Sequence, residues 1–250
     1  MARIRTSLAA AALTAVVFPL GAQVRPPTRS SGFTIDQFLS PASPLEVSAA
    51  RKADRIAWVS YERGMRNVYV AAAPDFKPLK ITSFTRDDGI DLGSVRLSDN
   101  GSIATFVRGS GQNRDGWVAN PSHDPAGGER AVWAAKTDGT GAWRLAVIAN
   151  TQVGGGRGGG APELSPDGRY AVFARDGQIF RASTARPAAT AIDTAGVPFI
   201  KAWGRQGNPQ WSPDGSKLAF VSTRDNHAFI GVYDMKSRRV DFIAPSTDID

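Results

Sequence analysis

The sequence predicts an all-β fold, a β-propeller of four-stranded antiparallel blades, with about four blades present in an incomplete ring. Three observations lead to this prediction. A tight-turn string followed by a strand occurs three times, each copy belongs to a unit of four short strands, and the 250 residues include 26 Gly and 16 Pro but few helical periodicities. Four-stranded units that repeat every few tens of residues are typical of propellers.

The repeated string combines a tight turn with a half-buried strand. Its copies read LSDNGSIATF, LSPDGRYAVF and WSPDGSKLAF, and they begin at Leu97, Leu164 and Trp211. The Gly adopts positive φ without steric cost, the Asp bonds nearby backbone, and the Pro prevents a central strand from continuing. In each copy the Ser stands eight residues before a Phe. In a degenerate first copy Ser48 stands ten residues before Trp58, so this copy requires a two-residue insertion.

Each unit contains four segments that are rich in strand formers and are joined by hairpin turns. The first unit comprises residues 45–50, 54–60, 66–73 and 79–85. The second comprises residues 93–97, 102–109, 130–139 and 142–150. The third comprises residues 160–164, 169–175, 178–183 and 189–193. The fourth comprises residues 208–211, 218–222, 229–235 and 238–244.

The chain divides into three parts. Residues 1–22 have the features of a secretory signal peptide, because Arg3 and Arg5 precede an apolar run that ends in small residues. Residues 23–40 form a lead-in that we expect to contain a short helix. Residues 41–250 form the partial propeller, with blades at roughly 41–86, 87–150, 158–195 and 205–250. The leader predicts a periplasmic or secreted bacterial protein with no membrane span after cleavage.

Composition narrows the range of partners. The formal net charge is +7, but the basic residues are scattered, and only residues 238–240 are densely basic. A nucleic-acid-binding surface would need a basic patch or stripe, so no nucleic acid partner is predicted. The chain has no Cys and therefore no disulfide framework and no Cys metal site. The sequence does not define an oligomeric state.

No catalytic, cofactor-binding or metal-binding residue is predicted within the 250 residues. The nucleophile elbow G-x-S-x-G does not occur, since RGSGQ at 108–112 has Arg in place of the first Gly. His123 and His227 are both expected in polar loops. The run GGGRGGG at 154–160 lacks the G-K-[ST] ending of a phosphate-binding loop and is expected to be a flexible insertion. The acidic string RDDGIDLG at 86–93 does not match a calcium loop and is expected to be an inter-blade turn.

One repeat position carries an aromatic residue in every unit. These residues are Trp58, Phe106, Phe173 and Phe220. Because they alternate with small and β-branched residues along strands, we expect them to form the cores between blades rather than a surface on which a ligand stacks.

The string PQWSPDGSKLAFVSTRDNHAFIGVYDMKSRRVDFIAPSTDID, at 209–250, resembles a TolB-type propeller repeat of the PD40 pattern. More narrowly, the chain is similar to the N-terminal propeller of secreted prolyl-oligopeptidase-family (S9) serine peptidases, the dipeptidyl-peptidase and acylaminoacyl-peptidase relatives. FTIDQFLSP at 33–41 and FIGVYD at 229–234 carry this narrower resemblance, which covers residues 33–250. The S-P-D-G string itself is specific for propellers and not for peptidases.

The resemblance implies a role in proteolysis. In that family the propeller caps an α/β-hydrolase domain with a Ser-Asp-His triad and restricts access to short peptides. This chain lacks such a domain, so we expect it to be the non-catalytic propeller portion of a serine peptidase, cut inside the propeller. Its partner would be a peptide substrate, reached through the missing catalytic domain. The alternative is a free-standing TolB-like periplasmic scaffold that binds proteins and performs no chemistry.

An insertion of about twenty residues interrupts the hairpin between the second and third strands of the second unit. It spans 109–128 and is polar and turn-rich except for Trp117 and Val118. Two interpretations stay open: a surface elaboration packed down by Trp117, or a loop that lines the entrance to the hydrolase domain. Strand parity predicts that residues 223–228 lie on the same side of the molecule as this insertion.

Overall fold

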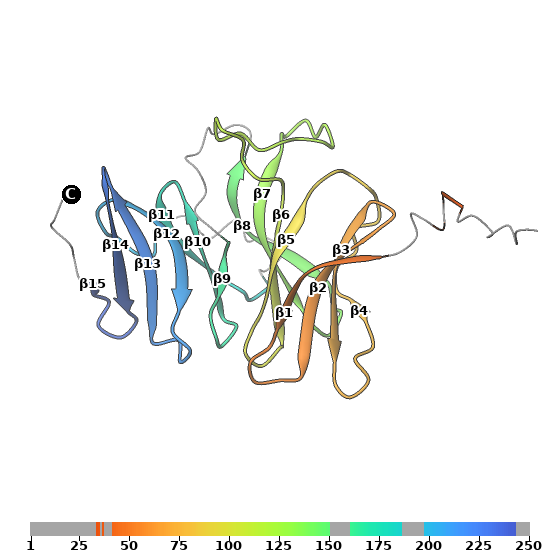
Figure 1. Cartoon of the computed structure of the whole chain (residues 1–250), viewed down its shortest axis with the longest axis horizontal. Helices are drawn as coiled ribbons and strands as arrows, with labels where there is room; N and C mark the ends of the chain where they lie inside the picture. The colour runs from red at the N-terminus through yellow and green to blue at the C-terminus, as the bar shows by residue number, and fades with distance from the viewer. Residues whose placement is uncertain (1–33, 36, 38–41, 151–160, 187–197, 244–250) are drawn as a thin grey trace, which may run out of the picture.

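The computed structural model describes residues 34–35, 37, 42–150, 161–186 and 198–243, and within them the fold is nearly all-β (Figure 1). The strands form four antiparallel sheets, which we call blades 1 to 4 in chain order. Blade 1 contains β1 (Ser43–Ala49), β2 (Arg55–Glu62), β3 (Met65–Ala72) and β4 (Leu79–Lys80). Blade 2 contains β5 (Leu92–Leu97), β6 (Ile103–Arg108), β7 (Glu129–Lys136) and β8 (Ala142–Asn150).

Blade 3 contains three strands within the described residues, and blade 4 contains four. Blade 3 comprises β9 (Glu163–Leu164), β10 (Tyr170–Arg175) and β11 (Gln178–Ser183). Blade 4 comprises β12 (Arg205–Trp211), β13 (Lys217–Arg224), β14 (His227–Asp234) and β15 (Val240–Ile243). The strand predicted at 189–193 lies outside the described residues. The sheets are up-and-down meanders, as the repeat pattern predicts for propeller blades.

The turn serine of each repeat closes its hairpin in the same way. Its Oγ accepts a hydrogen bond from the backbone N–H five residues later, at 3.1 Å for Ser98, 3.0 Å for Ser165 and 2.9 Å for Ser212. The same hydroxyl donates to the Asn or Asp side chain two residues later, at 2.9, 2.6 and 2.6 Å. The repeated S-x-[DN]-G string therefore encodes one hydrogen-bonded turn three times.

The first repeat is aligned differently from the sequence prediction. Ala50 N donates to Arg55 O at 2.9 Å, which is the bond that Ser98 N makes to Ile103 O in the next repeat. Ala50, and not Ser48, therefore occupies the turn position. The predicted two-residue insertion is wrong, because Ala50 also stands eight residues before Trp58.

The turn glycines let each blade approach the blade before it. A Cβ at Gly168 would lie 2.8 Å from Ser98 Cβ, and one at Gly101 would lie 3.3 Å from Arg55 Cβ. Backbone bonds also link the turns, because Lys52 N donates to Asp99 O at 2.7 Å and Asp99 N donates to Pro166 O at 3.1 Å. Glycine at this position therefore provides both the positive φ of the turn and the space for close stacking.

A separate hydrophobic core fills each interface between neighbouring blades. Between blades 1 and 2, Phe106 packs with Val59 and Val68. Phe173 of blade 3 and Phe220 of blade 4 hold the corresponding places in the next two cores. All three Phe side chains are about 1% exposed. The repeated aromatic position is thus core in blades 2 to 4, as predicted, whereas Trp58 of blade 1 is partly exposed.

Side-chain bonds extend the short fourth strand of blade 1. Only Leu79–Lys80 is regular strand, although the sequence predicts one segment over residues 79–85. Beyond it Asn67 Oδ1 accepts hydrogen bonds from Phe84 N at 2.9 Å and Thr82 Oγ1 at 2.8 Å. Asn67 Nδ2 donates to Phe84 O at 2.9 Å. The Asn amide replaces backbone pairing, so the segment follows β3 without a regular ladder.

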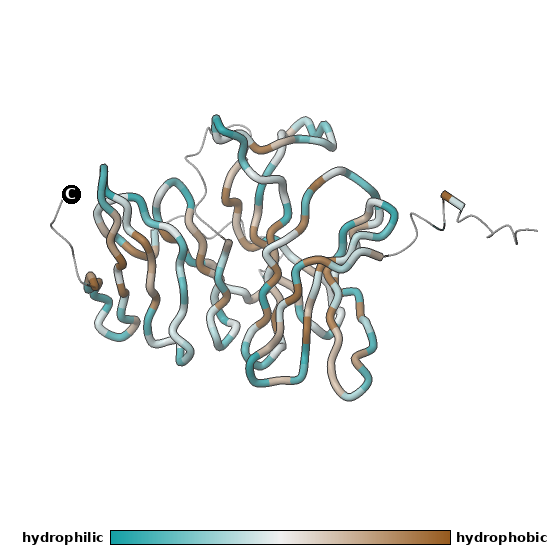
Figure 2. Tube along the Cα trace, viewed as in Figure 1, coloured by the Kyte–Doolittle hydropathy of each residue, from teal (hydrophilic) through white to brown (hydrophobic). Residues whose placement is uncertain are grey.

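The four blades do not close into a ring. Figure 1 shows blade 1 and blade 4 at opposite ends of the row of sheets. Figure 2 shows hydrophobic residues concentrated along the strands and hydrophilic residues in the loops at both ends of the sheets. In the lead-in, Ile35 and Gln37 are helical, and Thr34 and Gln37 exchange side-chain-to-backbone bonds of 3.0 and 3.1 Å, a capping box. No helix among the described residues is long and apolar enough to cross a membrane.

Candidate functional site

The connection between the second and third strands emerges on the same side of every blade (Figure 1). We call this side the loop face. The connections are residues 63–64, 109–128, 176–177 and 225–226. The insertion of blade 2 and the β13–β14 hairpin share the loop face, as strand parity predicts. Loops on a rigid scaffold are where recognition residues concentrate, so the loop face is the candidate binding face.

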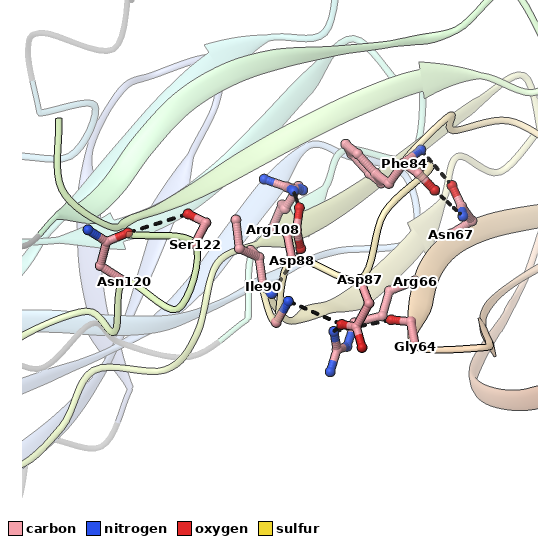
Figure 3. A network of polar contacts seen from close by, with 11 residues as sticks. Gly64, Arg66, Asn67, Phe84, Asp87, Asp88, Ile90, Arg108, Asn120 and Ser122 are labelled. Carbon is pink, nitrogen blue, oxygen red and sulfur yellow. Dashed lines mark hydrogen bonds and ion pairs between the residues drawn. The ribbon is translucent and has the colours of Figure 1, made fainter. Parts of the chain in front are cut away.

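The acidic string between blades 1 and 2 is held by arginines from both blades (Figure 3). Arg66 of blade 1 pairs with Asp87 at 3.4 Å, and Arg108 of blade 2 forms a short ion pair with Asp88. The Asp88 carboxylate also accepts a bond from Ile90 N at 3.0 Å. The segment acts as an inter-blade connector. No group of three His, Cys, Asp or Glu side chains in the described ranges is arranged to hold a metal ion.

Arg108 is further fixed by aromatic contacts. Its guanidinium lies 4.4 Å from the centre of the Phe84 ring, and Phe84 meets Trp133 edge to face at a centroid distance of 6.0 Å. Cation–π contact of this kind orients an arginine without consuming its hydrogen-bond donors. The Arg108 side chain is therefore part of a rigid floor beneath the insertion.

The insertion is built from two turns, each organised by an asparagine. Asn113 Oδ1 accepts hydrogen bonds from Asp115 N at 3.0 Å and Trp117 N at 2.8 Å. Asn120 Oδ1 accepts from Asp124 N at 3.0 Å, and its amide donates to Asp124 O at 2.8 Å. Asx turns satisfy backbone groups locally, so a polar loop of this length holds one shape.

Val118, and not Trp117, anchors the insertion to the blade. Val118 is 2% exposed and Trp117 is 48% exposed. The interpretation of an elaboration packed down by Trp117 is therefore wrong. A half-exposed indole on a structured loop is available for contact with another molecule.

An arginine side chain and a backbone hydrogen bond hold the start of the insertion. Arg130 Nη1 donates to Gly109 O at 3.0 Å, and Gly109 N donates to Asp91 O at 2.9 Å. Burial lowers the pKa of the Arg130 guanidinium, and the carboxylates of Asp91 and Glu46 oppose that shift. Glu46 belongs to β1, so the base of the insertion is tied electrostatically to blade 1.

A pocket of about 390 Å³ lies between the insertion and blade 2. Its lining comprises Ile90, Arg108, Ala119, Asn120, Pro121, Ser122, Asp124, Ala126, Gly127, Gly128, Glu129, Trp133, Arg144 and Val147. Arg144 pairs with Glu129 at 2.7 Å, so the guanidinium groups on the wall have carboxylate partners. The volume is in the range of small-ligand sites. The wall offers peptide groups, a hydroxyl and an indole ring, which can bind a small polar ligand or chain segment.

Sequence reasoning did not identify a polar ladder on the first strands of blades 2 to 4. Arg96, Glu163 and Gln210 each stand two residues before a turn serine. Glu163 Oε1 is 3.6 Å from Arg96 Nε and 3.3 Å from Gln210 Nε2. Burial raises the pKa of Glu163, and Arg96 and Gln210 oppose that shift. The equivalent repeat position was the signal that could have revealed these residues.

The remaining sequence candidates do not come together as a reactive site. The His227 ring lies 6.1 Å from Phe229, and His123 is an exposed loop residue with φ of 54°. Each turn Ser–Asp pair lies within one hairpin, and a nucleophile requires an adjacent base that is itself oriented. The glycine run at 154–160 lies outside the described residues. Within the described residues the arrangement supports binding.

No protein-family model matches this chain, and no curated protein matches its sequence. Among solved structures it is similar to TolB from Acinetobacter baumannii, with 18% identity and a TM-score of 0.52 over 82% of this chain and 44% of that chain. It is also similar to a structure from a study of two prolyl endopeptidases, with 14% identity and a TM-score of 0.52 over 82% of this chain and 30% of that one. The chain thus spans less than half the length of either structure. The shared feature is the fold, a β-propeller.

Proposed function

We propose that this chain is the propeller portion of a secreted serine peptidase that acts on short peptides. In this proposal it controls access to a catalytic α/β-hydrolase domain carried outside the 250 residues. The observation that supports it most directly is the structured insertion on the loop face, with the exposed Trp117 and the 390 Å³ pocket beneath it. The fold shared with a prolyl endopeptidase structure agrees with this role.

Export is part of the same proposal. Arg3, Arg5 and the apolar run that follows support signal-peptide cleavage near Ala22. Mature protein recovered from the periplasm or medium is expected to begin near Gln23. N-terminal sequencing that still reads Met1 in exported material would contradict cleavage.

A TolB-like scaffold is the second candidate function. The similarity to TolB over 82% of this chain favours it, and it requires no hydrolase domain. The same gene product would then bind partner proteins in the periplasm without chemistry.

Labelling of the native gene product separates the two candidates. An antibody against residues 42–243 would recover the protein from the source cells, and a serine-directed fluorophosphonate would label any active hydrolase in the same polypeptide. The peptidase proposal expects a labelled species larger than the 26.5 kDa of this chain. An unlabelled species, recovered with other periplasmic proteins, would support the scaffold instead. The purified 250-residue chain is expected to show no peptide hydrolysis in either case.

Whether the insertion at 109–128 controls substrate access can be tested in the full-length enzyme, if labelling identifies one. Replacing residues 109–128 with a two-residue turn is expected to alter the range of peptide lengths cleaved, because it removes Trp117 and the wall of the pocket. Hydrolysis of a minimal dipeptide chromogenic substrate should change little. The matched control is Ser237→Gly in the β14–β15 turn, on the opposite side of the molecule. Equal effects on long and minimal substrates, or none on either, would exclude the insertion from gating.

A further inference from the structure

A second pocket, of about 430 Å³, lies between blades 2 and 3 on the side of the molecule opposite the loop face. Its walls come from the ends of β7 and β11, the starts of β6, β8 and β10, and the turn between β9 and β10. Blades 2 and 3 are the two inner blades of the described row, so each has a neighbour on both sides. The lining includes no residue of the insertion, and the pocket is therefore distinct from the one described above.

Basic side chains outnumber acidic ones in this pocket. The basic residues are Lys136, Arg169 and Arg186, and the acidic residue is Asp167. The Asp167 carboxylate already serves its own turn, because Oδ1 accepts hydrogen bonds from Ser165 Oγ at 2.6 Å and from Arg169 N at 3.0 Å. Within the described part of the chain, Lys136 and Arg186 take part in no ion pair. The excess of positive charge favours an anionic ligand.

The same pocket has aromatic and aliphatic surface next to its cations. Trp143 is 7% exposed, and Ile103 is partly buried. The Arg186 guanidinium lies 5.9 Å from the centre of the Trp143 ring, and the Arg169 guanidinium lies 5.7 Å from the centre of the Tyr170 ring. A ligand that carries an apolar group beside its negative charge can therefore contact a cation and a ring together.

One buried donor in the lining lacks an acceptor. The indole Nε1 of Trp143 is buried and makes no hydrogen bond within the residues that the structure describes. Buried polar groups are normally paired, so this exception calls for an explanation. A carboxylate oxygen that enters the pocket is an acceptor of the kind that this donor lacks.

Backbone bonds hold the wall that carries Arg186. Thr184 N donates to Arg169 O at 3.0 Å, which ties the end of β11 to the turn before β10. The next amide, Ala185 N, donates to Ser183 Oγ at 3.2 Å. The backbone on both sides of the pocket is thus fixed by the fold, and a ligand does not have to order it.

We propose that this pocket binds a carboxylate attached to an apolar group, such as the C-terminal residue of a peptide. Lys136 and Arg186 pair with the carboxylate, and a guanidinium can bind both of its oxygens at once. The apolar group packs against Trp143 and Ile103. The volume is in the range of small-ligand sites. This inference does not rest on the peptidase proposal, because it concerns a different pocket and needs no hydrolase domain.

The test is the binding of defined ligands to the purified 250-residue chain, measured by isothermal titration calorimetry. The probes are N-acetyl-phenylalanine and an acetylated tripeptide that ends in phenylalanine, each compared with its C-terminal amide. We expect both acids to bind, and both amides to bind about tenfold more weakly or worse, because an amide forms no charged hydrogen bond. In NMR spectra either acid should shift the amide signals of Gly168 and Thr184, and not those of residues 119–129 at the loop face.

A double variant tests the two cations. Lys136→Gln/Arg186→Gln should weaken the binding of both acids about tenfold, because each exposed ion pair contributes a factor of up to about five. Both side chains are exposed, so the variant should retain the wild-type circular dichroism spectrum. The matched control is Lys236→Gln/Arg239→Gln, which makes the same change of charge at exposed residues of the β14–β15 connection and should leave the affinity unchanged.

The two acids also distinguish the source of the carboxylate. Tighter binding of the tripeptide would identify a peptide terminus, equal affinities would identify a free organic acid, and both results support the site. Acetate or inorganic phosphate that binds as tightly as the acids would overturn the proposal, because the apolar surface would then contribute nothing. Absence of binding, amides that bind as well as the acids, shifts confined to residues 119–129, or wild-type affinity in Lys136→Gln/Arg186→Gln would each overturn it as well.

Discussion

At the scale of single residues, hydrogen bonds from nearby hydroxyl and amide groups set the pKa values of the carboxylates in the hairpin turns. Hydrogen bonds from the Ser212 hydroxyl, and from the amide and hydroxyl of Ser216, lower the pKa of Asp214 to about 2. Bonds from the amide and hydroxyl of Ser237 lower the pKa of Asp234 to about 2 in the same way. Because these folded-state values are depressed, the stabilisation is present above the unfolded pKa and is lost as the pH falls through about 2.

Ser212→Ala tests this origin of the shift. The change removes the largest contribution, the hydroxyl donor 2.6 Å from Asp214 Oδ1, so the pKa of Asp214 should rise toward its ordinary value of 3.8. A titration that follows the carboxyl carbon by NMR measures it directly. The matched control is Ser237→Ala, which should raise the pKa of Asp234 and leave Asp214 unchanged. An unaltered Asp214 titration in Ser212→Ala would contradict the assignment.

Glu163 makes the stability of the fold depend on pH with the opposite sign. Burial raises its pKa above the ordinary 4.5, although Arg96, Gln210 and Arg51 oppose the shift. Its contribution to stability is therefore fully present below the unfolded pKa and is lost as the pH rises through the folded value. In Glu163→Gln this loss is absent, so the free energy of unfolding relative to wild type should increase between about pH 3.5 and about pH 7. A difference that stays constant across denaturant titrations at these pH values would refute the prediction.

At the scale of the element, the turn that opens each repeat affects two things: the conformation of its hairpin and the distance to the preceding blade. Gly168 has a φ of +73° and lies against Ser98 of the preceding blade. The turn therefore cannot accept another residue without changing both the hairpin and the interface.

Gly168→Ala should destabilise the protein by more than a turn effect alone. Positive φ costs an L-residue about 1–2 kcal/mol, and forcing an atom into a packed interface adds about 1–3 kcal/mol. Gly141→Ala is the control, because Gly141 has a φ of +98° and a Cβ added there would meet no atom within 4 Å. Chemical denaturation of both variants compares the two costs. Equal losses would show that the contact with Ser98 contributes nothing.

The strands were predictable from sequence because their signals are local. The spacing from Ser165 to Phe173 reflects a hydrogen-bonded turn followed by an alternating strand, and both depend on neighbouring residues only. The first repeat was misaligned because Ala50 holds the turn position through backbone bonds alone, which leave no side-chain signature. The features that the sequence did not predict depend on contacts between residues far apart in the chain. Sequence proximity does not reveal that Asp88 forms an ion pair with Arg108, or that Val118 rather than Trp117 is buried.

At the scale of the whole molecule, residues at the same repeat position differ in burial, because the described blades form an open row. Phe173 is enclosed between blades 2 and 3, whereas Trp58 holds the same repeat position on a face that none of the four described blades covers and is partly exposed. The stability of the molecule is therefore concentrated at its internal interfaces.

Replacing each of these two aromatic residues by alanine tests whether the buried ring contributes more to stability than the partly exposed one. Phe173→Ala removes a fully buried ring and should cost about 3–5 kcal/mol. Trp58→Ala should cost less, about 0.5–1.5 kcal/mol for the loss of its stack on Tyr69. Denaturant unfolding of the two variants and the wild type compares these losses. Similar losses at both positions would mean that the blade 1 face is covered in solution.

The bonds between turns run from Lys52 to Asp99 and from Asp99 to Pro166, and they stop there, because proline has no N–H to donate to blade 4. The junction of blades 3 and 4 keeps a backbone bond at the loop face, from Gln206 N to Gly177 O at 2.8 Å. Among the described residues, the backbone hydrogen bonds between blades 3 and 4 therefore lie toward the loop face, and a side-chain bond from Gln210 to Glu163 and a hydrophobic core complete the junction. The amides of blade 4 should be the first to exchange with deuterium in partial opening, while Asp99, whose amide is released only when blades 2 and 3 part, should be among the last.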